Sequence, residues 1–233
     1  MASISAPEFK VILCGEYGVG KTSLFRRFAT NSYLETATMS AAKSRQSTLG
    51  LDHLSRPFES TTGNRSLKLQ LWDTGGLERV ASITNSYYKF AEAALLVYSL
   101  DSLDSFHCLS QHLLEILSLA ENAKIFLVGN KSDLCPHEVQ QQDIDQFVEQ
   151  FPKFDGHFKV SCKTADGLPE MWSQVVDQLA AGSSLSAKTS MDAAFKLHQK
   201  QLLDGGYQQS SSLSSSAACC GGGGGSSSAA NTS

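Results

Sequence analysis

The sequence contains only six cysteines and five prolines among its 233 residues, and it has no long hydrophobic run. Spacing of the C-x-x-C type is missing among the four well-separated cysteines Cys14, Cys108, Cys135 and Cys162. This pattern indicates reduced, buried thiols and argues against a zinc site or a disulfide framework. No apolar stretch approaches the roughly 20 residues that span a bilayer, and residues 1–8 lack the features of a secretory signal. We therefore expect a cytoplasmic chain without a transmembrane segment.

Clustered positive charge is also missing. The net charge is −4 at pH 7, and lysines and arginines form no basic stripe. A general nucleic-acid binder needs such a stripe to neutralise phosphates, so we expect no nucleic-acid partner. A content of 41% hydrophobic and 18% charged residues is ordinary for one globular domain.

The composition changes abruptly after Gly182 and divides the chain in two. Residues 1–182 have the composition of a folded domain, whereas residues 183–233 are rich in Ser, Ala, Gly and Gln. A segment of that kind cannot bury enough apolar area to offset the entropy lost on ordering. We predict a low-complexity, largely disordered tail that carries Cys219 and Cys220.

The folded part shows apolar runs that alternate with helical patterns. Helical periodicity is clearest over residues 104–120 and 168–180, and two runs around residues 61–64 suggest an antiparallel hairpin. This alternation predicts an α/β fold with a mostly parallel six-stranded sheet and helices on both faces. The expected strands are residues 9–14, 51–58, 67–72, 93–100, 124–129 and 157–161.

Residues 15–22, Gly-Glu-Tyr-Gly-Val-Gly-Lys-Thr, match the phosphate-binding pattern G-x-x-x-x-G-K-[ST] between a strand and a helix. The glycines let consecutive N–H groups and the helix N-terminus point at phosphate oxygens. Lys21 would reach the β- and γ-phosphates, and Thr22 would ligate Mg²⁺. The predicted phosphate-side residues are Gly15, Glu16, Tyr17, Gly18, Val19, Gly20, Lys21, Thr22 and Ser23.

Three further motifs follow strands: D-x-x-G on the phosphate side, N-K-x-D on the guanine side, and Ser161-Cys162-Lys163, whose N–H groups can meet the guanine O6. Asp73 and Gly76 form a D-x-x-G motif, in which the carboxylate can hold the Mg²⁺ shell and the glycine N–H can donate to a γ-phosphate. Asp133 ends an N-K-x-D motif whose carboxylate can accept two hydrogen bonds from guanine, a donor pair that adenine lacks. Motifs at the ends of parallel strands are where open α/β sheets bind ligands. The predicted guanine-side residues are Asn130, Lys131, Asp133, Ser161, Cys162 and Lys163.

With these motifs in this order, the chain resembles a small GTPase of the Ras superfamily, and specifically of the Rab family. The Rab resemblance depends on residues 47–52, 72–79 and 83–89 and covers residues 8 to about 181. It implies a P-loop small GTPase fold, with residues 1–182 as the GTP-binding domain, GTP or GDP with Mg²⁺ as ligands, and a role as a switch in vesicle trafficking. A P-loop kinase is disfavoured, because the N-K-x-D motif supplies guanine selection.

The resemblance also assigns roles to single residues. Thr48 would close over Mg²⁺ and the γ-phosphate, and Tyr33 would pack on the guanine opposite Lys131. The effector-facing aromatic positions correspond to Trp72, Tyr87 and His53, where His53 replaces the usual Phe. Trp72 is equally compatible with a plain core residue. Exchange factors and effectors are the implied partners.

Two departures from the family pattern concern catalysis. Leu77 occupies the position of the Gln that orients the attacking water, and leucine forms no hydrogen bond. Tyr17 stands where Ras has glycine and would place a phenol ring beside the γ-phosphate. We therefore expect slow intrinsic hydrolysis, with Lys21, Thr48 and Gly76 as the remaining catalytic-side residues. Two alternatives stay open: a TBC-type activating protein restores the reaction, or the protein is a constitutively GTP-bound effector-binding module.

Two further departures concern the first switch and the membrane. The loop at residues 35–47 is longer than in typical Rabs, which suits either a tolerated insertion or a dedicated effector. Rabs are generally anchored through cysteines at the C-terminus, whereas Cys219 and Cys220 are followed by thirteen residues. The pair is compatible with lipidation, for instance S-acylation, or with an accident of the tail. Peripheral attachment to the cytosolic face of intracellular membranes is therefore an expectation carried by the resemblance.

Overall fold

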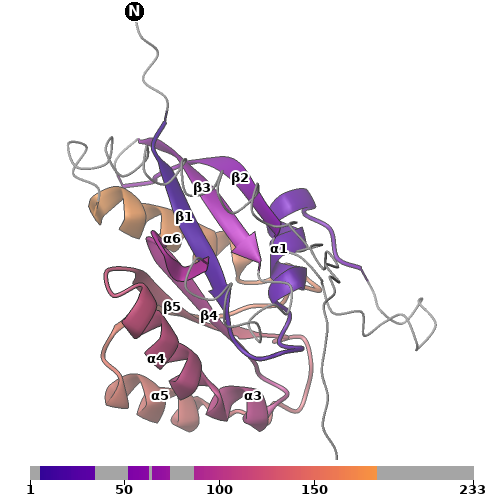
Figure 1. Ribbon diagram of the computed structural model, residues 1–233. Helices are drawn as coiled ribbons and strands as arrows, with labels where there is room; N and C mark the ends of the chain where they lie inside the picture. Colours follow the sequence, from indigo (N-terminus) through magenta and orange to yellow (C-terminus); the bar gives the residue numbers. More distant parts are fainter. Residues whose placement is uncertain (1–5, 35–51, 63–64, 74–86, 183–233) are drawn as a thin grey trace, which may run out of the picture.

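The computed structural model describes residues 6–34, 52–62, 65–73 and 87–182. Within them, a six-stranded sheet has the strand order β2-β3-β1-β4-β5-β6. All neighbouring strands are parallel except β2 and β3, which form an antiparallel hairpin at one edge. The predicted α/β fold with a mostly parallel sheet is confirmed, and helices lie on both sides of the sheet (Figure 1).

The elements follow one another along the chain in regular alternation after the edge hairpin. The strands are β1 (Glu8–Cys14), β2 (Asp52–Glu59), β3 (Ser66–Asp73), β4 (Ala93–Ser99), β5 (Lys124–Asn130) and β6 (Phe154–Lys159). The helices are α1 (Lys21–Thr30), α3 (Leu103–His107), α4 (Leu109–Leu119), α5 (Gln141–Gln150) and α6 (Leu168–Gly182).

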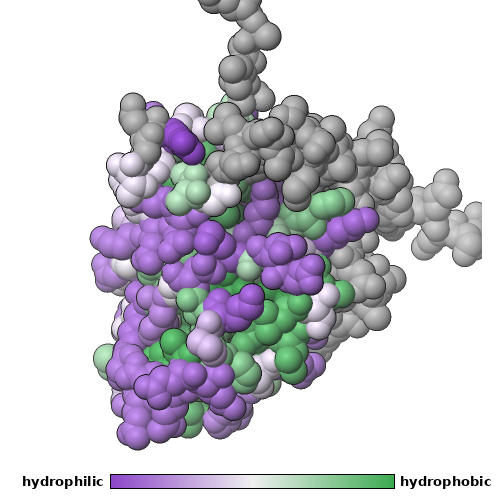
Figure 2. All heavy atoms as spheres, turned by 90° about the vertical axis from the view of Figure 1, so that its left-hand side faces the viewer, coloured by the Kyte–Doolittle hydropathy of each residue, from purple (hydrophilic) through white to green (hydrophobic). Residues whose placement is uncertain are grey.

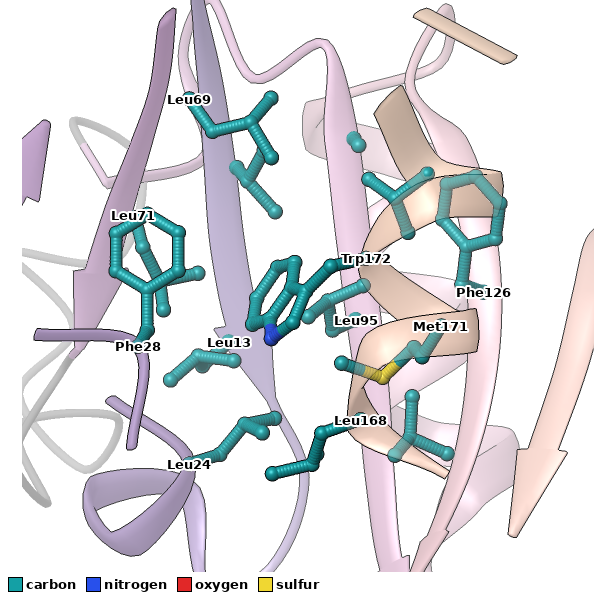
Figure 3. Close-up of a cluster of buried hydrophobic side chains, with 14 of the residues drawn as sticks. Leu13, Leu24, Phe28, Leu69, Leu71, Leu95, Phe126, Leu168, Met171 and Trp172 are labelled. Atoms are coloured by element: carbon teal, nitrogen blue, oxygen red, sulfur yellow. The ribbon is translucent and has the colours of Figure 1, made fainter. Parts of the chain in front are cut away.

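Alternate residues of the central strands belong to two separate hydrophobic cores, one on each face of the sheet. Leu13 and Leu95 point to the face covered by α1 and α6, where Trp172 packs against Phe28 with ring centroids 5.0 Å apart (Figure 3). Ile12 and Leu96 point to the opposite face, which α3, α4 and α5 cover. Since a strand with both faces buried reads as a continuous apolar run, the sequence pattern of β1 and β4 is explained.

One carboxylate joins the edge hairpin to the last helix. Asp177 of α6 accepts hydrogen bonds from the hydroxyl and N–H groups of Thr61 and from the Ser60 hydroxyl, the latter at 2.7 Å. These donors, first of all the Thr61 hydroxyl, lower the pKa of Asp177 to about 2. The hairpin turn is thereby fixed against α6 at the edge of the sheet.

Two expectations about individual elements were wrong in detail, and one helix was not predicted. The helix expected over residues 104–120 divides at Cys108, where the hydrogen bonds to Asp104 and from His112 lengthen to 3.2 and 3.4 Å. The last strand runs over Phe154–Lys159 rather than 157–161, because its pairing with β5 starts at Ile125 and Ser161 turns away to bond Asp166. Helix α5 was not predicted, because Ile144 is its one fully buried residue.

Among the described residues, no helix has the length and apolar character needed to cross a membrane. The face seen in Figure 2 is mostly hydrophilic, with a limited hydrophobic area near its centre. Large exposed apolar side chains are scattered over several elements, for example Leu34, Leu114 and Leu134. Single exposed apolar residues of this kind are normal on a protein surface.

Candidate functional site

The loops that carry the predicted motifs meet at the carboxyl ends of the parallel strands. They surround a cavity of about 420 Å³. A larger, more open hollow of about 880 Å³ lies against α6, but it is remote from these loops and lacks their glycines and lysines. The smaller cavity is therefore the candidate site. It is lined by Gly18, Gly20, Ser23, Tyr33, Asn130, Lys131, Asp133, Leu134, Cys162 and Lys163.

Two glycines of the phosphate loop are required by close contacts as well as by their backbone angles. Gly15 has φ of 133°, and a Cβ there would lie 2.0 Å from the carbonyl oxygen of Val97 in β4. Gly20 has φ of 101°, and a Cβ there would lie 2.3 Å from the side-chain nitrogen of Asn130. Any side chain at either position would clash and adopt an unfavourable backbone conformation. The loop therefore packs directly on β4 and on the guanine-side motif.

The start of α1 is suited to hold phosphate. Gly20 is its N-cap residue and offers no side chain to the N–H groups of the first turn. Those groups and the positive end of the helix dipole form an anion site. The buried Lys21 reaches back across the loop, where its Nζ donates to the carbonyl oxygens of Gly15 at 2.8 Å and Glu16 at 2.9 Å. This donor set fits nucleotide phosphates.

The predicted metal ligands Thr22 and Asp73 meet although they are 51 positions apart. The Thr22 Oγ1 donates to Asp73 Oδ2 at 2.7 Å, which joins the first turn of α1 to the end of β3. A hydroxyl and a carboxylate are oxygen donors of the type that Mg²⁺ prefers, and Mg²⁺ often takes its other ligands from water and substrate phosphates. The pair therefore fits the ion, and Asp73 is buried as a positioned ligand would be.

The guanine-side motif is held by a network of internal hydrogen bonds. The Asn130 side chain donates to the Val19 carbonyl at 2.8 Å and accepts from the Cys162 N–H at 3.1 Å. The Ser161 hydroxyl donates to Asp133 Oδ1 at 2.6 Å. One asparagine thus connects the phosphate loop with the loop after β6, and Asp133 is oriented through one of its two oxygens.

Lys131 has an ion-pair partner that sequence reasoning missed. Its Nζ lies 3.2 Å from Asp101 Oδ1, at the end of the turn after β4. Although burial raises the pKa of Asp101, the Ser99 hydroxyl and Lys131 together hold it below its ordinary value. Lys131 itself has φ of 65°. The pair fixes the lysine stem at the rim of the cavity, on which a flat base can stack.

Tyr33 and the loop after β6 form further parts of the cavity wall. Tyr33 is partly buried and packs against the core beneath α1 and α6. The Cys162 thiol is buried, and this burial raises its pKa to about 12. The Cys162 side chain is therefore a packing group, and Cys14 is buried as well. Cys108 is only partly buried and Cys135 is exposed, so the expectation of buried thiols is wrong for these two.

The catalytic side is less enclosed. Tyr17 is 47% exposed, and its N–H donates to the Glu16 carboxylate at 2.9 Å. The other predicted residues of this side, Thr48, Gly76 and Leu77, lie outside the described residues. Cys219 and Cys220 lie outside them as well. Their roles remain sequence-based predictions.

The three residues at effector-facing positions lie together, but two of them are buried. His53 stacks on Trp72 with ring centroids 4.6 Å apart, and Trp72 is fully buried. The Tyr87 hydroxyl accepts a hydrogen bond from the Leu13 N–H at 2.9 Å, and Tyr87 is only 1% exposed. In this conformation the core interpretation of Trp72 is favoured, and partly buried His53 is the accessible member of the cluster.

Arg27 is a second residue that sequence reasoning missed. It lies in α1, yet its guanidinium group donates to main-chain carbonyl oxygens of the loop after β6. The only sequence signal was a charged residue beside the buried face of a helix, next to the exposed Arg26. Such a residue is usually read as a solvated surface group.

Three features lie together at the carboxyl ends of the parallel strands: a phosphate loop that precedes a helix, a threonine–aspartate pair and a guanine-selective motif. Together they define a P-loop nucleotide-binding protein. Comparison with known families agrees, because the model of the Ras family matches residues 10–181. The chain therefore belongs to the Ras family, as a Rab-type small GTPase.

The relatives carry Rab or Ypt names. Ras-related protein Rab-30 of Homo sapiens is 37% identical over 166 residues, which cover 70% of this chain and 76% of that protein. The GTP-binding protein ypt1 of Schizosaccharomyces pombe is 33% identical over 195 residues, 82% of this chain and 90% of that protein. Ras-related protein RABD2b of Arabidopsis thaliana is 42% identical over 132 residues, which cover 56% of this chain and 60% of that protein. These likenesses support GTPase activity and a role in vesicle trafficking.

Proposed function

We propose that the protein is a Rab-like switch that binds GTP and GDP with Mg²⁺ and hydrolyses GTP slowly. The observation that carries the nucleotide choice is the hydrogen-bonded frame around Asp133, in which Ser161 and Asn130 orient the guanine-side loops. A carboxylate fixed in this way accepts from the N1–H and 2-amino groups of guanine, and an adenine nucleotide offers no matching donors.

Phosphate binding is supported by the other half of the cavity. Lys21 and the open N-terminus of α1 provide charge and N–H donors for the β- and γ-phosphates. Thr22 and Asp73 would hold Mg²⁺, which neutralises charge on the phosphate oxygens when bound. Thr48 and the Gly76 N–H are proposed to complete this side when GTP is present.

Slow hydrolysis follows from two side chains on the catalytic side. Leucine at position 77 cannot orient a water molecule, and removing one such polar group typically costs on the order of 10² to 10³ in rate. Tyr17 is 47% exposed, and its ring would lie beside the γ-phosphate, in the region that an attacking water or an arginine finger from a partner would use. Both residues act against the same chemical step and leave nucleotide binding intact.

A constitutively GTP-bound effector-binding module is the second candidate. It is favoured by the contrast between a well-ordered binding frame and the altered catalytic positions Tyr17 and Leu77. In either case we propose effectors at the surface of the His53, Trp72 and Tyr87 cluster, where His53 is the accessible member. An exchange factor and a TBC-type activating protein would complete the cycle, and Cys219 and Cys220 would be the lipidated residues on a cytosolic membrane face.

Identification of the nucleotide that copurifies with the protein tests the proposal. Chromatography of the extracted nucleotide should give guanine nucleotides with a large GTP fraction. GDP as the sole species would contradict the constitutively GTP-bound module, and adenine nucleotides would contradict the assigned base specificity.

The Leu77→Gln variant then tests the assignment of slow turnover. Single-turnover phosphate release from GTP should accelerate by about 10-fold or more, since the restored amide can orient water. Leu77→Asn serves as a control, because its shorter amide reaches less far. Wild-type hydrolysis at the rate of an ordinary Rab, without any partner, would contradict the proposal.

A further inference from the structure

The Arg27 side chain of α1 contacts both the loop after β6, which lines the candidate base pocket, and the residue that ends its own helix. Its Nε donates to the Cys162 carbonyl at 2.6 Å, and its Nη2 donates to the Lys163 carbonyl at 2.6 Å. Its Nη1 donates to the Asn31 carbonyl at 2.8 Å. All three bonds are short and charge-assisted, a class that is roughly twice as strong as neutral hydrogen bonds.

The first two contacts fix the loop after β6. Each carbonyl belongs to a rigid peptide plane whose N–H points the opposite way. Holding the carbonyls of Cys162 and Lys163 therefore sets the direction of the following N–H groups. The loop is fixed on its other side by Asn130, which accepts from the Cys162 N–H, and by Ser161. The N–H groups of Lys163 and Thr164 donate to the Ser161 hydroxyl at 3.1 and 3.0 Å, and that hydroxyl donates to Asp133 Oδ1. The position of the loop therefore determines how the Asp133 carboxylate is presented to a base.

The third contact fixes the chain that leaves α1. Asn31 is the C-cap residue, with φ of 52°, and it lies two residues before Tyr33, which lines the same cavity. One guanidinium group thereby spans the gap between the Tyr33 wall and the Cys162–Lys163 wall. Its planar, forked donors suit this task, whereas a lysine would offer a single point charge.

From this geometry we infer that Arg27 is a positioning residue for guanine recognition. It holds the loop whose Lys163 and Thr164 N–H groups donate to the Ser161 hydroxyl, which in turn donates to Asp133. It also ties that loop to the segment carrying Tyr33. Loss of Arg27 shortens the lifetime of the bound guanine nucleotide and weakens the distinction between guanine and a base that lacks the 2-amino group. This inference rests on the proposed guanine-nucleotide function of the same cavity.

The neighbouring arginine provides a matched control. Arg26 lies on the same helix and is exposed, so Arg26→Ala removes the same charge without removing the contacts made by Arg27. Arg27→Lys keeps the charge but cannot donate to three carbonyl groups in one plane. Comparison of Arg27→Ala, Arg27→Lys and Arg26→Ala therefore separates loss of charge from loss of the planar contacts.

The experiment measures the release of a fluorescent GDP analogue from the full chain with Mg²⁺, chased with excess GDP. We expect Arg27→Ala to accelerate release by about 10-fold or more, which is the scale of one lost charge-assisted hydrogen bond. Arg27→Lys should be intermediate, and Arg26→Ala should match the wild type. Release from Arg26→Ala as fast as from Arg27→Ala would overturn the inference, because charge alone would then explain the effect.

A second measurement separates base recognition from general loosening. The affinity of each variant is compared for GDP and for inosine 5′-diphosphate, which keeps O6 and N1–H and lacks only the 2-amino group. We expect the preference for GDP to shrink by several-fold in Arg27→Ala, while equal weakening of both ligands would overturn the positioning role. If Arg27→Ala does not fold, the same ratio in Arg27→Lys decides the question. A wild-type protein that binds no GDP would instead contradict the proposed function.

Discussion

The base side and the phosphate side of the cavity are built in different ways. On the base side, Asn130, Ser161 and Asp133 are connected by internal hydrogen bonds, and Arg27 holds the same loop from behind. On the phosphate side, the helix start and Lys21 are well formed, but Tyr17 is largely exposed at the outer part of the loop. The contrast suggests that nucleotide choice and nucleotide lifetime are set by parts of the molecule that differ from those setting the rate of hydrolysis.

The strongest test of this contrast is Asp133→Asn. An amide offers one acceptor where the carboxylate offers two, so we expect GDP affinity to fall on the order of 10³-fold or more. Xanthine nucleotides, which carry a carbonyl at C2, should bind the variant better than guanine nucleotides do. Competition titration measures both effects. Glu121→Gln, at an exposed residue after α4, is the control and should leave affinity unchanged.

The next largest effect is expected for Asn130→Ala, because Asn130 joins the two sides. Its removal leaves the Val19 carbonyl and the Cys162 N–H without their side-chain partner. Each lost buried bond costs about 1–3 kcal/mol, so nucleotide release should accelerate on the order of 10²-fold. Stopped-flow release of labelled GDP is the measurement. A variant with wild-type release would show that the two sides are independent after all.

A smaller and selective effect is expected for Tyr17→Ser. Removing the ring opens the region beside the γ-phosphate, so phosphate release should accelerate several-fold while the affinity for GDP changes by less than about twofold. Single-turnover assays and titration give the two values. Equal changes in both would contradict the separation of binding from hydrolysis.

The smallest effect is expected for Asp177→Asn, far from both sides. The pKa of Asp177 is held at about 2, below the ordinary value near 4, by the Thr61 and Ser60 hydroxyls. The charged form is favoured in the folded state, so its stabilisation is present above about pH 4 and is lost as the pH falls through about 2. The melting temperature of the variant at pH 7 should be about 2 °C below that of the wild type, and this difference should vanish in acid. Nucleotide affinity should be unchanged.

Much of the fold could be predicted because its signals are local. The apolar runs of β1, β4 and β5 and the phosphate-loop pattern between β1 and α1 each depend on a few neighbouring residues. The antiparallel edge hairpin also follows from a turn between two short runs. Helix α5 escaped prediction because seven of its ten residues are polar and only Ile144 is fully buried, with Phe147 and Val148 partly buried beside it.

The parts of the site that could not be predicted depend on distant contacts. Arg27 meets Cys162 across 135 positions, and Lys131 meets Asp101 across 30. No periodicity marks such pairs, since each requires that elements distant in the sequence already lie side by side. The burial of Trp72 and Tyr87 is of the same kind, because the tyrosine hydroxyl is bound by the main chain of β1.

The close approach of Gly20 to Asn130 has a consequence for how this sequence can change. A single added methyl group at position 20 would lie 2.3 Å from the side-chain nitrogen of residue 130. A larger residue at one position would be accommodated only by a smaller one at the other, and that smaller residue would give up both bonds that Asn130 makes. Each single substitution on the way to the double change therefore weakens the site. The two positions therefore constrain each other across 110 residues of sequence, and a mutational scan should find both intolerant.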